Sequence, residues 1–151
     1  MPTDGERSGS LLTLYKGVRD TAQAAELKRI VATSGWPVIS VYGEDIDQSA
    51  FLIVQHADMD PAFQKEVLPL LESLAQQGES SKENYALLFD RVAIASGRPQ
   101  RYGSQGECKG RRFDLHPTEP GDVDARRKAM GLDPIRVYRR NVETMFCAGE
   151  G

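Results

Sequence analysis

The sequence is poor in the residues that most often bind metals. It has two histidines and two cysteines among 151 residues, so a zinc site built from nitrogen and sulfur ligands is not expected. Cys108 and Cys147 lie far apart and form no CxxC pair, which predicts two free thiols in a reducing compartment. Neither a metal nor a cofactor is predicted.

Long hydrophobic runs are also absent. No stretch approaches the ~20 apolar residues of a membrane span. The opening residues, MPTDGERSGS, lack the apolar centre of a secretion signal. These absences predict a cytoplasmic protein that does not enter a membrane. The net charge of -3 argues against a general attraction to nucleic acid. The sequence leaves the oligomeric state open.

The pattern that is present is helical. Hydrophobic residues make up 40% and charged residues 27% of the chain, which suits one globular domain. Apolar residues recur at spacings of three and four, as in amphipathic helices. Asp60-Pro61, Ser80 with Glu83, Asp122 and Asp133-Pro134 are typical helix starts. We expect helical structure from about residue 11 to 34, with a capped helix over 22–34, then helices over 46–57, 61–77 and 81–96 and a final pair over 122–147.

Two segments break this pattern. The stretch GWPVISVYG, residues 35–43, is expected to be extended, because Pro37 blocks a helix. The glycine-containing segment near 100–115 predicts a short β-hairpin. The expected fold is therefore mainly α, a single-domain helical bundle over residues 11–147 with one inserted hairpin. Residues 1–10 are expected to be disordered, and residues 148–151 to form a flexible tail.

Several polar side chains fall where the pattern predicts burial. His56 ends the apolar run FLIVQH, and Asp90 interrupts the apolar helix NYALLFDRVAIAS. A buried carboxylate is costly unless it is paired, and the candidate partners of Asp90 are His56, Arg91 and Tyr102. The full set of polar residues expected to gather at one site is Gln55, His56, Gln64, Asp90, Arg91, Gln100, Tyr102 and Gln105.

This set suggests a small metal-independent enzyme. Asp90 would hold one ring nitrogen of His56, and the other nitrogen would act as general acid or base. Tyr102 would donate to a developing negative charge. The substrate-binding residues would contact a polar small molecule that undergoes hydrolysis, elimination or cyclisation; they are Gln55, Gln64, Arg91, Gln100 and Gln105.

Other interpretations stay open. The cluster can instead belong to a non-catalytic module that binds a ligand or a protein, with the same residues fixing helix packing. In that case His56 caps a helix end, Asp90 and Arg91 form a structural pair, and Gln64 lies on a solvated face. Asp58 and Asp60 are better explained as loop and N-cap residues than as a metal or acid–base pair. The basic segment RRKAMGLDPIRVYRR is better explained as a solvated face than as a nucleic-acid site.

Three segments together resemble a bacterial family whose function is not known. They are LIVQHADMDPAFQKEVLPLL, NYALLFDRVAIASGRPQRYGSQ and VDARRKAMGLDPIRVY, and the resemblance covers residues 22–140. The family's motifs are Q-H-A-D, D-R-V and P-Q-x-Y-G-T-Q. Here Ser104 stands where the family has threonine, and GECKGRRFDL replaces an aromatic strand. The resemblance implies that the expected site residues, with Asp58, belong to the family's shared motifs, and it implies no reaction.

Overall fold

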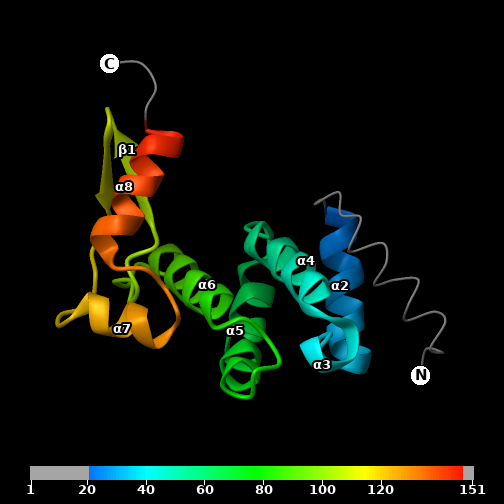
Figure 1. Ribbon diagram of the computed structural model, residues 1–151. Coiled ribbons are helices and arrows are strands. Elements are labelled where there is room, and N and C mark those ends of the chain that lie inside the picture. The colour runs from blue at the N-terminus through cyan, green and yellow to red at the C-terminus, as the bar shows by residue number, and fades with distance from the viewer. Residues whose placement is uncertain (1–20, 148–151) are drawn as a thin grey trace. The chain divides into compact units, whose positions relative to one another are not determined.

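The computed structural model describes residues 21–147. Within this range the chain is mainly α-helical, with one two-stranded antiparallel sheet (Figure 1). The expected mainly α fold with a late hairpin is thus confirmed. The chain divides into two compact units, Met1–Tyr85 and Ala86–Gly151, while the expected single domain stays a prediction. The expectations for residues 1–20 and 148–151 lie outside the described residues.

The first unit is helical in its described part. Four of its helices are α2 (Thr21–Ser34), α3 (Ile39–Tyr42), α4 (Glu44–Gln55) and α5 (Pro61–Gln76), and α6 (Lys82–Ala95) begins there. Apolar side chains on α2, α4 and α5 form its core, among them the fully buried Leu27, Val54 and Val67. The packing of these apolar side chains against one another, more than local helix propensity, keeps such short helices folded.

A buried carboxylate ties the loops of this unit together. Asp47 is 2% exposed and accepts hydrogen bonds from the Trp36 indole at 2.8 Å and the Ser80 hydroxyl at 2.6 Å. Its second oxygen accepts from the backbone N–H of Ser81 at 3.2 Å. Three donors compensate the cost of burying the charge. Asp47 therefore holds Ser80 and Ser81, the two residues that precede α6.

Two local predictions in this unit were wrong. The segment expected to be extended contains α3, which forms because the Val38 carbonyl accepts from the N–H groups of Val41 and Tyr42. Pro37 precedes this turn and does not interrupt it. Ser81, and not Ser80, caps α6, since its hydroxyl accepts from Asn84 N–H at 3.2 Å. The Ser80 hydroxyl is already donated to Asp47.

The second unit combines the rest of α6 with a hairpin and two helices. Strand β1 (Gly106–Lys109) pairs with β2 (Arg112–Leu115), and α7 (Val123–Ala129) and α8 (Ile135–Phe146) follow. Strand β2 packs on α8, where the rings of Phe113 and Tyr138 meet edge to face. Asp122 caps α7 as expected. Asp133 does not cap α8; the carboxylate of Asp124 accepts from Ile135 N–H instead.

The two cysteines form a disulfide, so the prediction of free thiols was wrong. Cys108 on β1 bonds Cys147 at the end of α8, with their Cα atoms 5.4 Å apart. The two residues are 39 positions apart in sequence, and only the packing of the hairpin on α8 brings them together. Spacing alone therefore gave no sign of the pair.

Candidate functional site

The turn around His56 joins α4 to α5, and a buried glutamine holds it. Gln64 on α5 is 3% exposed. Its amide nitrogen lies 3.0 Å from the Val54 carbonyl, 3.3 Å from the Gln55 carbonyl and 3.2 Å from an Asp58 carboxylate oxygen. The last carbonyls of a helix lack partners within it, and Gln64 supplies one here. The residue is therefore not on a solvated face.

His56 is the C-cap of α4 and its side chain is exposed. Its backbone N–H bonds the Leu52 carbonyl at 3.1 Å. The imidazole makes no hydrogen bond or ion pair within the described part of the chain. As far as residues 21–147 are concerned, its two nitrogens are left to solvent or to a ligand, as a general acid or base requires.

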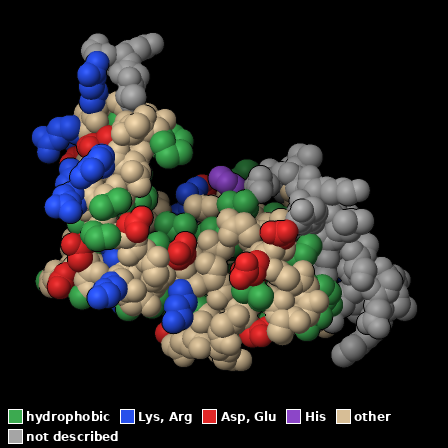
Figure 2. Space-filling view, viewed as in Figure 1, with side chains coloured by type: hydrophobic (Ala, Val, Ile, Leu, Met, Phe, Trp, Pro, Cys, Tyr) green, Lys and Arg blue, Asp and Glu red, His purple; other side chains and the backbone are tan. Residues whose placement is uncertain are grey.

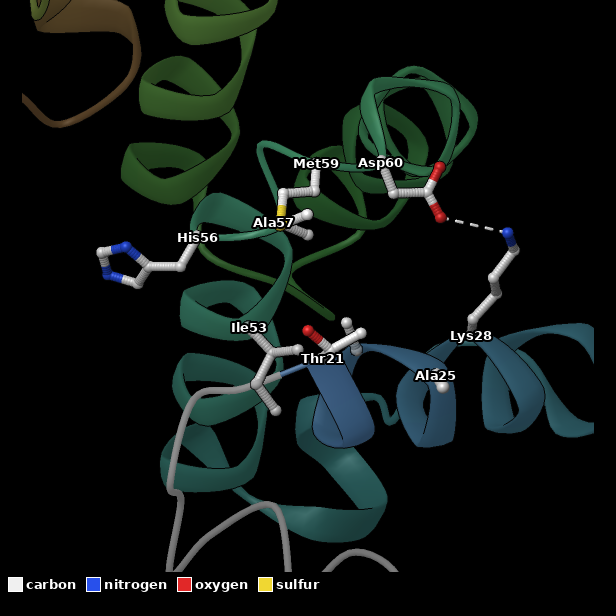
Figure 3. A pocket seen from close by; sticks show the side chains of 9 residues that line it. Thr21, Ala25, Lys28, Ile53, His56, Ala57, Met59 and Asp60 are labelled. Carbon is white, nitrogen blue, oxygen red and sulfur yellow. Dashed lines mark hydrogen bonds and ion pairs between the residues drawn. The ribbon is translucent and has the colours of Figure 1, made fainter.

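His56 stands at the wall of a cavity of about 550 Å³ between α2 and the α4–α5 turn. We call this cavity the His56 groove. Figure 3 shows its walls, with the imidazole extending to the side away from Lys28 and Asp60. Most of the lining is apolar or small; the residues are Thr21, Ala24, Ala25, Lys28, Ile53, His56, Ala57, Met59 and Asp60.

An ion pair lies at the other side of the groove. The Lys28 ammonium is 3.1 Å from the Asp60 carboxylate (Figure 3). Asp60 also caps α5 by accepting from Phe63 N–H at 3.2 Å, as the sequence predicted. Lys28, and then this backbone N–H, hold the pKa of the Asp60 carboxyl below its usual value of 3.8. Asp60 is therefore charged at neutral pH and already has partners.

The second polar cluster lies in the other unit, around the loop Gln100–Gln105. Asp90 on α6 is 0% exposed. One carboxylate oxygen accepts from the N–H groups of Arg101 at 2.8 Å and Tyr102 at 2.9 Å. The other accepts from Ser104, from its N–H at 3.0 Å and its hydroxyl at 2.7 Å. Four donors satisfy the buried charge, and the carboxylate fixes the shape of the loop.

Gln100 closes the same loop. It is 0% exposed, and its amide oxygen accepts from Gln105 N–H at 2.8 Å. Its amide nitrogen lies 2.8 Å from the carbonyls of Gln105 and His116. The Gln105 side chain donates to the Ser104 hydroxyl at 3.1 Å. The amide groups of these two glutamines thus bond to the protein itself.

Arg127 is a central residue that sequence reasoning missed. It is 1% exposed and donates to the carbonyls of Tyr102 at 2.7 Å and Asp133 at 2.6 Å. Its guanidinium lies 4.8 Å from the centre of the Tyr138 ring, and the Tyr138 hydroxyl donates to the Ser104 carbonyl at 2.7 Å. Burial lowers the pKa of Arg127 and raises that of Tyr138. Nothing in the basic run RRK distinguishes this arginine from the half-buried Arg126 before it or the exposed Lys128 after it.

The predicted site residues divide between the two units. Gln55, His56 and Gln64 belong to the first; Asp90, Arg91, Gln100, Tyr102 and Gln105 belong to the second. Within the second, Asp90 meets the backbone of Tyr102, and the Tyr102 ring packs edge to face on Phe89. The proposed pairing of His56 with Asp90 would join the units, and it stays a prediction.

A comparison with protein families matches residues 5–148 to a family of unknown function, DUF6624. The chain belongs to this family. The expected membership in a family of unknown function is thereby confirmed, while the motifs and the bacterial origin stay predictions, and the match assigns no reaction or ligand. No curated protein and no solved structure matches the chain. Over residues 21–147, no helix is long and apolar enough to cross a membrane.

Proposed function

We propose that this DUF6624 protein binds a small organic molecule in the His56 groove. The observation that carries the proposal is the groove itself. Its volume of about 550 Å³ falls in the range of small-molecule sites, roughly 300–1,000 Å³. Three alanines line it, and such short side chains leave room that larger residues would fill.

The lining indicates the chemistry of the ligand. Ile53, Met59 and the alanines favour an apolar body. Thr21 offers a hydroxyl group, and Lys28 offers a cation that Asp60 already partly neutralises, while the His56 imidazole lies at the edge of the groove and extends away from this pair. A molecule with an apolar body and one polar or anionic end suits this arrangement. The sequence predicted a polar small molecule, and we now propose an amphiphilic one.

The hydrogen bonds of the motif residues favour binding without turnover. Gln64, Asp90 and Gln100 are buried and bond chiefly to backbone groups. Such bonds set the shape of the α4–α5 turn and of the loop after α6. Residues that bind a substrate would instead direct some of their polar atoms at the ligand. The family motifs therefore serve as the frame of a binding module in this proposal.

A substitution that fills the groove with a larger side chain tests this proposal. In Ala25→Phe, an exposed lining residue of α2 becomes large enough to occupy the cavity. The probe is 1-anilinonaphthalene-8-sulfonate, which has an apolar body and one anionic group. We expect Ala25→Phe to weaken its binding by at least about tenfold, equal to ~1.4 kcal/mol. Ala32→Phe, an exposed position on the same helix outside the lining, should not change it. Equal affinities in the two variants would reject the groove as the site.

His56 acid–base catalysis is the second candidate. It is favoured by the exposed imidazole at the wall of the groove, with both nitrogens unbonded in the described part of the chain. If a groove ligand is hydrolysed, eliminated or cyclised, His56→Ala should abolish product formation and leave ligand affinity within about threefold. Incubation of wild type and variant with each ligand found, followed by mass spectrometry, measures this. Equal product from both proteins would exclude His56 as the acid–base group.

A further inference from the structure

Three arginines gather on one face of α8, in the second unit. Arg136, Arg139 and Arg140 line a hollow of about 350 Å³ with Ile135 and Glu143. Their spacing of three and four residues places the guanidinium groups on neighbouring turns. Figure 2 shows Lys and Arg side chains gathered over the part of the molecule formed by the hairpin and α8. We call this hollow the arginine hollow.

These arginines make no hydrogen bond or ion pair within the described part of the chain. The one acid of the hollow, Glu143, accepts from Phe113 N–H at 2.8 Å. Arg139 lies close enough to Asp114 to help lower its pKa, but Lys109, at 3.0 Å, is the main partner of that carboxylate. Like charges one helical turn apart repel each other. A bound anion would relieve this repulsion.

The helix that carries the arginines is firmly held. Its Tyr138 hydroxyl donates to the Ser104 carbonyl, and the Tyr138 ring packs on Phe113. The disulfide between Cys108 and Cys147 fastens its end to the hairpin. Little ordering of the backbone would therefore accompany binding, which favours affinity.

We propose that the arginine hollow binds the phosphate group of a small phosphorylated molecule. Guanidinium groups donate two parallel hydrogen bonds to phosphate oxygens, a geometry that lysine lacks. The volume of about 350 Å³ suits one such group and its immediate substituent. The second unit holds 12 Lys and Arg against nine Asp and Glu, and the first holds seven against 13. An anion is thus attracted to the unit that carries the hollow.

Inorganic pyrophosphate is the probe, and calorimetric titration of the full chain measures its affinity. We expect Arg136→Gln and Arg140→Gln each to weaken binding by at least about tenfold, as the loss of one charge-assisted contact predicts. Arg98→Gln removes an exposed charge from the same unit outside the hollow and should change affinity by less than about twofold. Both α8 positions are exposed, so circular dichroism should show unchanged folding.

Two further probes identify the source of the phosphate. A single-stranded oligonucleotide and vesicles of phosphatidylglycerol are titrated against the same variants. Weaker binding of both than of pyrophosphate supports the proposal, as does their displacement by pyrophosphate. It is overturned if Arg98→Gln matches the α8 variants, if those variants bind as wild type does, or if only the oligonucleotide or the vesicles bind.

Discussion

At the scale of single residues, Asp90 determines the shape of the loop that follows α6. Asp90→Asn keeps the size of the side chain but brings an NH₂ group against backbone donors that the carboxylate accepts from. We expect a loss of about 3 kcal/mol in unfolding free energy, measured by urea denaturation. Glu83→Gln, the same chemical change at an exposed position of α6, should cost less than about 0.5 kcal/mol. A similar loss in both variants would contradict a structural role for Asp90.

Substitutions at Gly103 and Gly97 distinguish the cost of backbone strain from the cost of crowding. Its φ is +70°, and a Cβ there would lie 2.8 Å from Ile135 Cδ1. Gly97 has a similar φ of +75° but open space around it. Gly97→Ala should therefore lower the free energy of unfolding by about 1 kcal/mol, through backbone strain alone. Gly103→Ala should lower it by about 2–3 kcal/mol, because crowding against Ile135 adds to the strain. Thermal and urea unfolding of both variants measure the difference. Equal costs would mean that Ile135 moves aside freely.

The sequence predicted that Asp90 is buried and needs partners, and both points hold. It named side chains as candidate partners, His56, Arg91 and Tyr102. In the structure its carboxylate accepts from the backbone N–H groups of Arg101, Tyr102 and Ser104 and from the Ser104 hydroxyl. Backbone donors are present at every residue, so no pattern of side chains can indicate them. The sequence did not indicate the role of Arg127 for a related reason. Its side chain donates to backbone carbonyls, which every residue carries.

At the scale of elements, the start of α5 is sensitive to acid. The Asp60 pKa is lowered by Lys28 and by the Phe63 N–H, so the charged carboxylate stabilises the folded state. This stabilisation is complete above the usual pKa of 3.8 and is lost as pH falls through the lower folded value. Asp60→Asn, which can still cap the helix, should be less stable than wild type at neutral pH.

The difference between wild type and Asp60→Asn should shrink as pH falls through the lowered pKa of Asp60, because the wild-type carboxyl then loses its charge. Urea midpoints measured from neutral to acidic pH test this. Lys28→Gln serves as the matched variant, and the double variant should be no worse than Asp60→Asn at neutral pH. A difference that persists in acid would show that the charge of Asp60 is not its source.

The disulfide fixes the hairpin to α8. Reduction of Cys108–Cys147 should lower unfolding free energy by about 2–4 kcal/mol, because it frees a long loop in the unfolded chain. Urea unfolding with and without dithiothreitol measures the change, and mass spectrometry after thiol alkylation counts free cysteines. The Cys108→Ser/Cys147→Ser double variant should be less stable than the oxidised protein and insensitive to dithiothreitol. Free thiols in the protein purified without reductant would contradict the bond.

The strongly periodic helices were predictable, whereas contacts between distant segments were not. The expected helices over 22–34, 46–57, 61–77 and 81–96 correspond to α2, α4, α5 and α6 within two residues at each end. The disulfide, and the hydrogen bond from Ile135 N–H to the Asp124 carboxylate, depend on tertiary packing. The short helix α3 was missed because Pro37 was expected to block a helix, whereas the helix begins after it, at Ile39.

At the scale of the whole molecule, the two candidate sites lie in different units and share no residue. We therefore expect their binding energies to be additive. Ala25→Phe should leave the pyrophosphate affinity within about twofold of wild type, and Arg140→Gln should do the same for the groove probe. Titration of each probe in the presence of a saturating amount of the other gives an independent measure. A coupling above about threefold would show that the units communicate.

The disulfide also has a mechanical consequence. When the two chain ends are pulled apart, tension entering at the C-terminus crosses from Cys147 directly to Cys108. The intervening segment, with β2, α7 and α8, carries no load while the bond holds. Its 39-residue span then stays out of the extended length, which is shorter by about 130 Å than that of the reduced chain. Redox state would thus decide how much of the second unit can be stretched.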